Sequence, residues 1–266
     1  MSKKRVDLEG IKKISLDILM DIDRVCREND IKYSIVGGTL LGAVRHGGYI
    51  PWDDDVDIAM LRPEYEKFLG IYPKKGKYKL FDNRTHPDYY YLFGKVVDGH
   101  TELIEDDLNR IKGMGICVDV FPVDRVDSKG AKRKVRKLNF YKKGLMKNIF
   151  DIEKTSKSKL RLILKKMIYR KDFQYYHDRL SELMQSENGD ETDKVSIQGE
   201  MFKNLWMMPR NLYDEYIDIG FEGKKVRCMK DYKTFLEIRY GDYMTLPPVE
   251  ERKAHPRKVY FRDEEK

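Results

Sequence analysis

The chain has 266 residues, 41% of them hydrophobic and 12% aromatic, which is enough for a sizeable core and excludes a disordered protein. It has no apolar run of about 18 residues, and no apolar stretch follows the basic N-terminus, so we expect neither a transmembrane helix nor a signal peptide. Its three cysteines are far apart and odd in number, which argues against a zinc site or a disulfide framework and favours a reducing cytoplasm.

The net charge of +8 is unevenly distributed along the chain. Residues 128–171 contain 17 Lys and Arg but only two acidic residues, a net charge of +15, so the rest of the chain carries −7. The basic character therefore belongs to one segment.

The first third of the chain alternates between helical and extended patterns. Apolar residues recur at spacings of three and four over 8–28, which predicts an amphipathic helix. A strand is expected over 31–36. A glycine-punctuated loop follows over 37–49, with a short helix at 40–45. A further helix is expected over 62–72, because Pro63 occupies its favoured first position.

Four of the five residues at positions 53–57 are aspartates. Asp55 and Asp57 alternate with apolar residues, so on a strand they share one face, together with Asp53 if the strand begins early. Asp54 then faces away, and we expect it to be a structural partner. Neighbouring carboxylates repel each other unless a cation lies between them, and oxygen ligands suit Mg²⁺. Upstream, the turn at Gly38 and Thr39 leaves backbone N–H groups able to approach a phosphate.

Residues 77–121 are rich in strand patterns, with runs at 78–81, 89–97 and 115–122. The third run is apolar except for Asp119, and a lone carboxylate in such a run is costly to bury unpaired. It is either capped by an arginine or by backbone groups, or it is a third metal ligand from a neighbouring strand. We favour the metal ligand because it completes the acidic group. Asp124 is expected at a turn or a helix cap.

The basic segment predicts two amphipathic helices, with apolar residues at helical spacing over 138–152 and again over 160–168. Basic amphipathic helices favour anionic surfaces, so the segment could contact an anionic membrane. Alternatively, the apolar stripes pack on the domain and the lysines are solvated. Nucleic acid is a third interpretation, although no known motif supports it. Further on we expect a helix over 173–185, a turn at 221–223 and a helix over 231–240.

An apolar strand, a Gly-Gly turn, an Asp-x-Asp strand and a distant Asp together resemble the nucleotidyltransferase fold. A more specific resemblance comes from the amino-acid sequences of three segments, 37–58, 118–124 and 240–248 with His255. These sequences resemble the LicD family of phosphocholine transferases, relatives of the fukutin group. The resemblance spans most of the chain and is weakest over 128–200.

The resemblance implies an α+β fold with a nucleotidyltransferase-like mixed β-sheet core flanked by helices and a helical C-terminal part. It divides the chain into a catalytic core (1–127), a basic helical region (128–200) and a C-terminal helical region that completes the active site (201–266).

The resemblance also implies transfer of phosphocholine, or a related phospho-alcohol, from CDP-choline or another CDP-alcohol. The acceptor would be a hydroxyl of a cell-surface glycan or its lipid-linked precursor, such as teichoic acid, lipopolysaccharide or capsule. Mg²⁺ or Mn²⁺ would be the cofactor, held by Asp53, Asp55, Asp57 and Asp119, of which the last three are the catalytic candidates. The enzyme would be cytoplasmic, with peripheral contact to the inner face of the plasma membrane.

Several side chains are candidates for holding substrate. Arg45 and Lys95 could neutralise phosphate charge, although Lys95 could also be merely solvated. His46 could act as an acid or a base, donate a hydrogen bond to a phosphate, or anchor the loop. Aromatic residues could form a cation–π box for a quaternary ammonium group, although aromatic runs are also typical of a core. The box would consist of Trp52 and the Tyr89–Tyr91 run. His255 is carried from the family pattern without a derived role, and His86, His100 and His177 are expected at the surface.

Two other functions fit parts of the pattern. The same fold could use an NTP donor, transfer a nucleotide to a small acceptor and release pyrophosphate. A basic membrane- or nucleic-acid-binding protein with a decayed site is the non-enzymatic interpretation, but the presence of all the expected carboxylates argues against decay.

Overall fold

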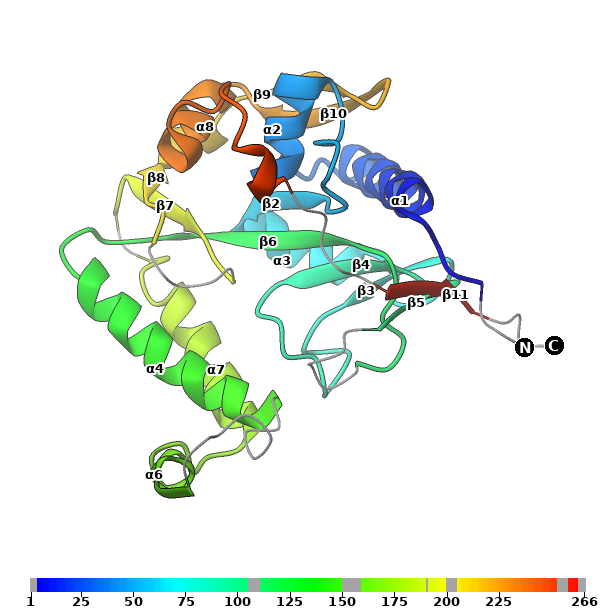
Figure 1. Cartoon of the computed structure of the whole chain (residues 1–266). Helices are drawn as coiled ribbons and strands as arrows, with labels where there is room; N and C mark the ends of the chain where they lie inside the picture. The colour runs from blue at the N-terminus through cyan, green and yellow to red at the C-terminus, as the bar shows by residue number, and fades with distance from the viewer. Residues whose placement is uncertain are drawn as a thin grey trace.

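The computed structural model describes residues 4–104, 111–149, 159–189, 191–199, 205–252 and 258–262 (Figure 1). The helices, including the short 3₁₀ helices η1 and η2, are α1 (Leu8–Glu28), α2 (Gly37–His46), α3 (Arg62–Ile71), α4 (Ala131–Ile149), α6 (Lys159–Ile168), α7 (Phe173–Gln185), η1 (Arg210–Tyr213), α8 (Tyr232–Tyr240) and η2 (Val249–Glu251). The strands are β1 (Ser34–Ile35), β2 (Asp57–Leu61), β3 (Tyr78–Phe81), β4 (Gly94–Asp98), β5 (Thr101–Ile104), β6 (Cys117–Arg125), β7 (Lys194–Ile197), β8 (Met208–Pro209), β9 (Tyr216–Phe221), β10 (Lys224–Met229) and β11 (Lys258–Phe261).

The main sheet has seven strands and mixed direction. Its central order is β1-β2-β6-β4-β3, and β7 adds to β6 and carries β8. β2 and β6 run parallel, whereas β4 and β7 are antiparallel to β6. A mixed sheet flanked by helices confirms the expected α+β class.

Alternation along β2 and β6 separates a core face from a polar face. Ile58 and Val120 are register partners and are fully buried, while Asp57 and Asp119, one residue earlier on each strand, are partners on the opposite face. α1 and α3 pack against the strands of this sheet. The two faces thus follow from the period of two in the sequence.

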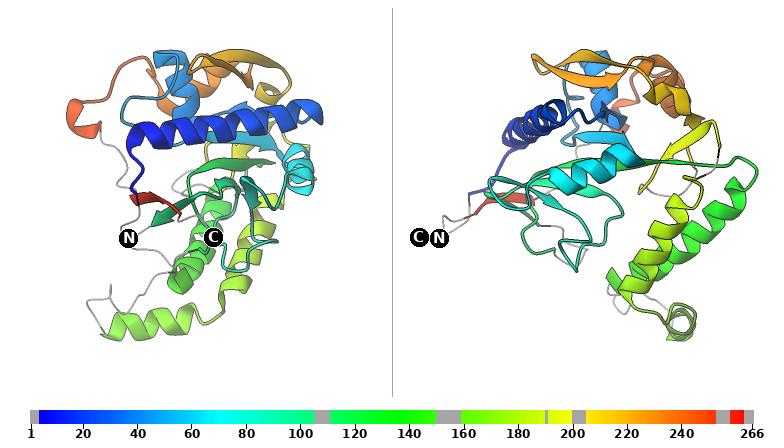
Figure 2. Two further views of the ribbon diagram at one scale, coloured as in Figure 1. Left: turned by 90° about the vertical axis from the view of Figure 1, so that its right-hand side faces the viewer. Right: turned by 180° about the vertical axis from the view of Figure 1, so that it is seen from behind.

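The basic segment forms an arm that projects from the sheet. α4 and α7 pack side by side, and α6 crosses the far end of the arm (Figures 1 and 2). The two long helices approach closely at Gly144, where a Cβ atom would lie only 2.3 Å from the ring of Tyr176. Among the described helices none is long and apolar enough to cross a bilayer.

The C-terminal part contains the expected helix α8, together with strands that the sequence patterns did not indicate. β9 and β10 form a hairpin whose turn residues Glu222 and Gly223 have φ angles of 50° and 70°. The turn at this place was correctly predicted. β11 pairs with β5, so this late strand lies beside a strand from the first half of the chain.

Candidate active site

α2 begins at Gly37, three residues before the start that the sequence predicted. Its first two residues are glycines, and the neighbouring carboxylates leave little room for a Cβ atom at either position. Gly37 has φ +59°, and a Cβ there would lie 3.0 Å from Asp57 Oδ2. A Cβ on Gly38 would lie 2.5 Å from Asp53 Oδ2, closer than real contacts allow. Two carboxylates thus lie against the first turn of α2. The positive end of the helix dipole and the unpaired N–H groups of a first turn stabilise negative charge there.

Thr39 has a defined contact in this turn. Its side chain is almost fully buried, and its hydroxyl accepts a hydrogen bond from the backbone N–H of Asp57 at 2.8 Å. The backbone N–H of Val36 also donates to the Asp57 carbonyl, at 3.0 Å. Thr39 therefore positions the start of β2. The prediction that Gly38 and Thr39 hold phosphate oxygens is not tested by these contacts and stays a prediction.

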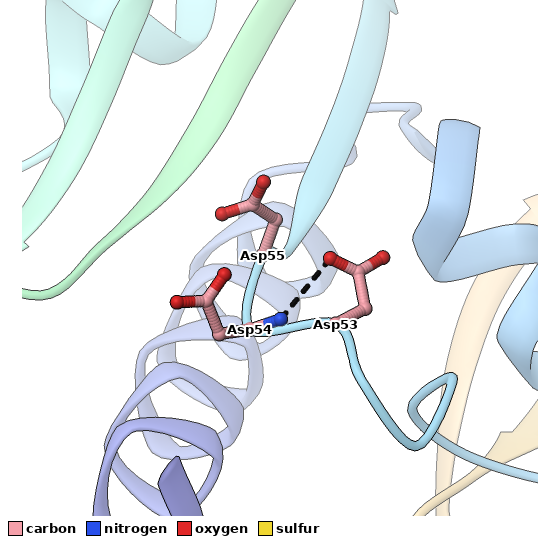
Figure 3. A group of neighbouring side chains, drawn as sticks. All are labelled: Asp53, Asp54 and Asp55. Carbon is pink, nitrogen blue, oxygen red and sulfur yellow. Dashed lines mark hydrogen bonds between the residues drawn. The ribbon is translucent and has the colours of Figure 1, made fainter. Parts of the chain in front are cut away.

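Three consecutive carboxylates gather just before β2. Asp53, Asp54 and Asp55 each offer an oxygen atom, and these atoms all lie within 4.8 Å of one another (Figure 3). Asp53 Oδ1 accepts a hydrogen bond from the backbone N–H of Asp54 at 3.0 Å.

The strand begins only at Asp57, so the shared-face argument does not extend to Asp53 and Asp55. Local geometry instead places Asp54, which is 3% exposed, in the acidic group. The burial of Asp54 depends on tertiary packing, and the expectation that it is a structural partner stays a prediction.

A row of charged side chains crosses the polar face of the sheet next to this group. The parallel register sets Asp57 beside Asp119, and the antiparallel register sets Asp119 beside Lys95. Lys95 is only 6% exposed and its Nζ lies 2.5 Å from Asp119 Oδ1. The expected position of Lys95 on the strand next to Asp119 is confirmed. Asp119 has a cationic partner, but a lysine rather than the arginine considered above.

Aromatic rings enclose the Lys95 ammonium. Its Nζ lies 4.3 Å from the ring centroid of Tyr91 and 4.9 Å from that of Phe93. Tyr89 is fully buried, and its hydroxyl donates to the Phe93 carbonyl at 2.7 Å. The rings of Tyr91 and Phe93 therefore contact a cation of the chain itself and fix the position of the Lys95 ammonium group.

The other half of the expected aromatic box contacts a different cation. The guanidinium of Arg252 lies 5.5 Å from the ring centroid of Trp52, and Arg252 Nε donates to the Pro247 carbonyl at 2.8 Å. Trp52 and Tyr91 therefore each contact a cation of the chain. A site for quaternary ammonium built from both stays a prediction.

Arg45 and His46 end α2 and contact the C-terminal segment. Arg45 Nη1 donates to the carbonyls of Tyr243 and Thr245 at 3.2 and 3.4 Å, and its Nε donates to His46 Nε2 at 3.1 Å. Burial, and then the Arg45 charge, lower the pKa of His46, which favours the neutral imidazole that can accept this bond. His255 lies outside the described residues.

Two expectations near the site are wrong. Asp124 lies within β6 rather than at a turn or cap, fully buried, and makes a bidentate pair with Arg62 of α3. His177 is also buried, because α7 packs toward the Tyr89–Tyr91 segment. The Nε2 atom of His177 lies 3.3 Å from the Tyr91 carbonyl oxygen. Neither contact has a local sequence signal, since the partners are distant in the chain.

Comparison with known proteins finds one matching family model and several similar proteins. A family model described as LicD/FKTN/FKRP, nucleotidyltransferase domain, matches residues 30–231. The chain is 29% identical over 270 residues to the lipopolysaccharide cholinephosphotransferase LicD of Haemophilus influenzae, covering 95% of this chain and 97% of that protein. An uncharacterised protein of Rickettsia typhi is 42% identical over 86 residues, 31% of this chain and 28% of that protein.

Proposed function

Because the chain belongs to the LicD/FKTN/FKRP nucleotidyltransferase-domain family, we propose that it is a metal-dependent transferase that moves phosphocholine, or a related phospho-alcohol, from a CDP-activated donor to a glycan hydroxyl. The observation that carries this proposal is the strand register that sets Asp57 beside Asp119, next to the Asp53–Asp55 group. The phosphocholine group is supported by the name of the Haemophilus influenzae relative, which is similar over nearly its full length.

The group of carboxylate oxygens in the site suits a hard divalent cation. Asp53, Asp54 and Asp55 offer oxygens within 4.8 Å of one another, and Asp57 and Asp119 are neighbours on adjacent strands. Carboxylate oxygens suit Mg²⁺ or Mn²⁺. Asp119 pairs with Lys95 through Oδ1, and a carboxylate can use both oxygens, so this pair is compatible with ligation through Oδ2. We assign Asp53, Asp55, Asp57 and Asp119 as the metal ligands, with Asp54 as an additional candidate.

The proposed reaction is a phospho-alcohol transfer, and the arrangement of the carboxylates is compatible with it. The acceptor oxygen forms a bond to the β-phosphorus of the CDP-alcohol, the bridging P–O bond breaks, CMP leaves with the electron pair, and the acceptor hydroxyl releases its proton to water. When bound, the metal neutralises diphosphate charge and lowers the pKa of the acceptor hydroxyl. Lys95 and the first turn of α2 supply fixed positive charge, and Asp57 and Asp119 hold the negative charge opposite them.

The acceptor and the place of reaction belong to the same proposal. The relative's name specifies lipopolysaccharide, so a glycan or lipid-linked glycan hydroxyl is the acceptor class that we propose, teichoic acid and capsule precursors included. A nucleotide-activated donor is made in the cytoplasm, so we propose that the enzyme acts there.

A second donor class has one observation in its favour, the description of the matching family model as a nucleotidyltransferase domain. An NTP-using enzyme would transfer a nucleotide and release pyrophosphate. The carboxylates and Lys95 would serve either donor, since both present a diphosphate to the site.

A donor screen tests the proposal. Purified protein is incubated with an acceptor glycan, Mg²⁺ and CDP-choline, CDP-ribitol, CDP-glycerol or CTP, and both CMP and pyrophosphate are measured. We expect CMP from CDP-choline or another CDP-alcohol, with the phospho-alcohol recovered on the glycan. Pyrophosphate from CTP, without CMP from any CDP-alcohol, would contradict the proposal and support the nucleotidyltransferase.

A further inference from the structure

The two apolar stripes of the basic arm have different environments. Leu138, Leu145 and Ile149 of α4 are buried, as are Tyr176 and Leu180 of α7, the helix on which α4 packs. The interpretation that the stripe packs on the domain is therefore correct for α4. Its lysines surround a stripe that other residues already cover.

α6 keeps its apolar face exposed. Four of its side chains are large, apolar and about half exposed or more: Ile163 (54%), Leu164 (48%), Met167 (68%) and Ile168 (56%). Their spacing of i, i+1, i+4 and i+5 places them on one side of the helix. Single exposed apolar residues are normal on a protein surface, but four on one helix face form a patch that marks a contact site.

The charge around this patch identifies its occupant. Residues 159–171 contain six Lys and Arg and no acidic residue. Lys166, Arg170 and Lys171 are exposed beside the apolar side chains. A second copy of the chain would bring the same positive charge against itself, which disfavours self-association through this face. An apolar face flanked by cations matches a bilayer whose headgroups are anionic.

The position of α6 permits this contact. The helix crosses the end of the arm formed by α4 and α7, at a distance from the sheet (Figures 1 and 2). Lys147 Nζ donates to the Tyr169 carbonyl at 2.8 Å, and the rings of Phe140 and Tyr169 lie 5.4 Å apart, so the chain after α6 is held against α4. α6 therefore lies at the tip of the arm, where its four apolar side chains are exposed.

We propose that α6 is a membrane-surface anchor: it lies in the plane of an anionic bilayer, inserts Ile163, Leu164, Met167 and Ile168 between the lipids and contacts the headgroups through Lys166, Arg170 and Lys171. The proposal does not depend on the reaction that the carboxylates catalyse. It would bring an enzyme without a described spanning helix to a surface where a lipid-linked acceptor could be met.

Flotation of the full-length protein with two kinds of vesicle tests the anchor. One kind is phosphatidylcholine alone and the other contains one third phosphatidylglycerol. We expect wild-type protein to float with the anionic vesicles, less so at high salt. Met167→Gln/Ile168→Gln should weaken this binding by at least about tenfold, because two apolar side chains no longer leave water. The matched control, Ile71→Gln/Phe261→Gln, changes two exposed apolar residues outside α6 and should bind like wild type.

Charge variants and the oligomeric state complete the test. Lys166→Gln/Arg170→Gln/Lys171→Gln should lose about fivefold per cation on anionic vesicles only. Absence of wild-type binding to anionic vesicles, or equal binding by the apolar pair and its control, would overturn the proposal. So would dissociation of a wild-type dimer by the apolar pair with vesicle binding unchanged.

A fluorescence probe gives a readout independent of the double variants. Leu164→Trp places an indole on the apolar face of α6. We expect its emission to shift to shorter wavelength on anionic vesicles as the ring leaves water, and an unshifted emission would contradict insertion. CMP release with a soluble acceptor should be unchanged in the Met167→Gln/Ile168→Gln variant, which separates a failed anchor from a failed reaction.

Discussion

Asp57→Asn is expected to lower the rate of phospho-alcohol transfer by about a thousandfold while the protein stays folded. Asp57 lies beside Asp119 at the start of β2, and the substitution removes one negative charge from the group that would hold the cation. Metal stabilisation of transition-state charge is worth several kcal/mol, and about 4 kcal/mol corresponds to three orders of magnitude in rate. The backbone N–H of Asp57 still donates to Thr39, so the strand start should be preserved.

The measurement is CMP release at saturating Mg²⁺, with thermal unfolding as a check of the fold. Asp178→Asn is the matched control, because Asp178 is an exposed residue of α7 whose carboxylate contacts Gln174. It should retain wild-type activity. Asp119→Asn is less specific, since it also leaves the buried Lys95 ammonium without its carboxylate partner. Full activity in Asp57→Asn would show that Asp57 is not a metal ligand.

Asp124→Ala is expected to reduce the free energy of unfolding by about 3–5 kcal/mol, because it leaves the largely buried Arg62 with only its longer ion pair to the more exposed Glu66. Asp124 is fully buried and Arg62 is 13% exposed. Arg62 Nε and Nη2 donate to Asp124 Oδ1 and Oδ2 at 2.7 and 2.6 Å. Asn188 Nδ2 adds a third bond to Oδ1 at 2.6 Å. The pair joins α3 to β6 behind the site.

Urea denaturation measures this effect, with Glu182→Ala as the control. Glu182 pairs with Arg179 across two largely exposed side chains, so its loss should cost less than about 1 kcal/mol. Arg62→Met/Asp124→Leu should recover most of the stability lost in Asp124→Ala, because apolar replacement of both partners removes the unpaired charge. If Asp124→Ala destabilised no more than Glu182→Ala, the buried pair would not contribute as described.

The sequence predicted the parts of the site that depend on local periodicity. Alternation along a strand is enough to place Asp57 opposite buried Ile58 and to mark Asp119 as a solitary carboxylate in an apolar run. Because consecutive strands are usually neighbours in a sheet, Lys95 could be placed on the strand next to Asp119. The hypothesis of a shared metal site linked Asp119 to the Asp53–Asp57 stretch, and the strand register sets Asp119 beside Asp57.

The features that it missed depend on contacts between distant segments. Asp124 has the same sequence context as a turn residue, and only α3 docking supplies Arg62 as its partner. Asp54 is buried and lies within the acidic group, which depends on the folding of the segment before β2. The basic arm makes the same point, since α4 and α6 have similar apolar stripes and only the packing of α7 on α4 shows which stripe is covered.

We propose that Asp53, Asp55, Asp57 and Asp119 hold a divalent cation that the transfer reaction requires. The most direct test is CMP release from CDP-choline by protein treated with a chelator, before and after addition of Mg²⁺ or Mn²⁺. We expect release to be abolished by the chelator, restored by either ion in the wild type and not restored in Asp57→Asn. Undiminished release of CMP in excess chelator would contradict the claim.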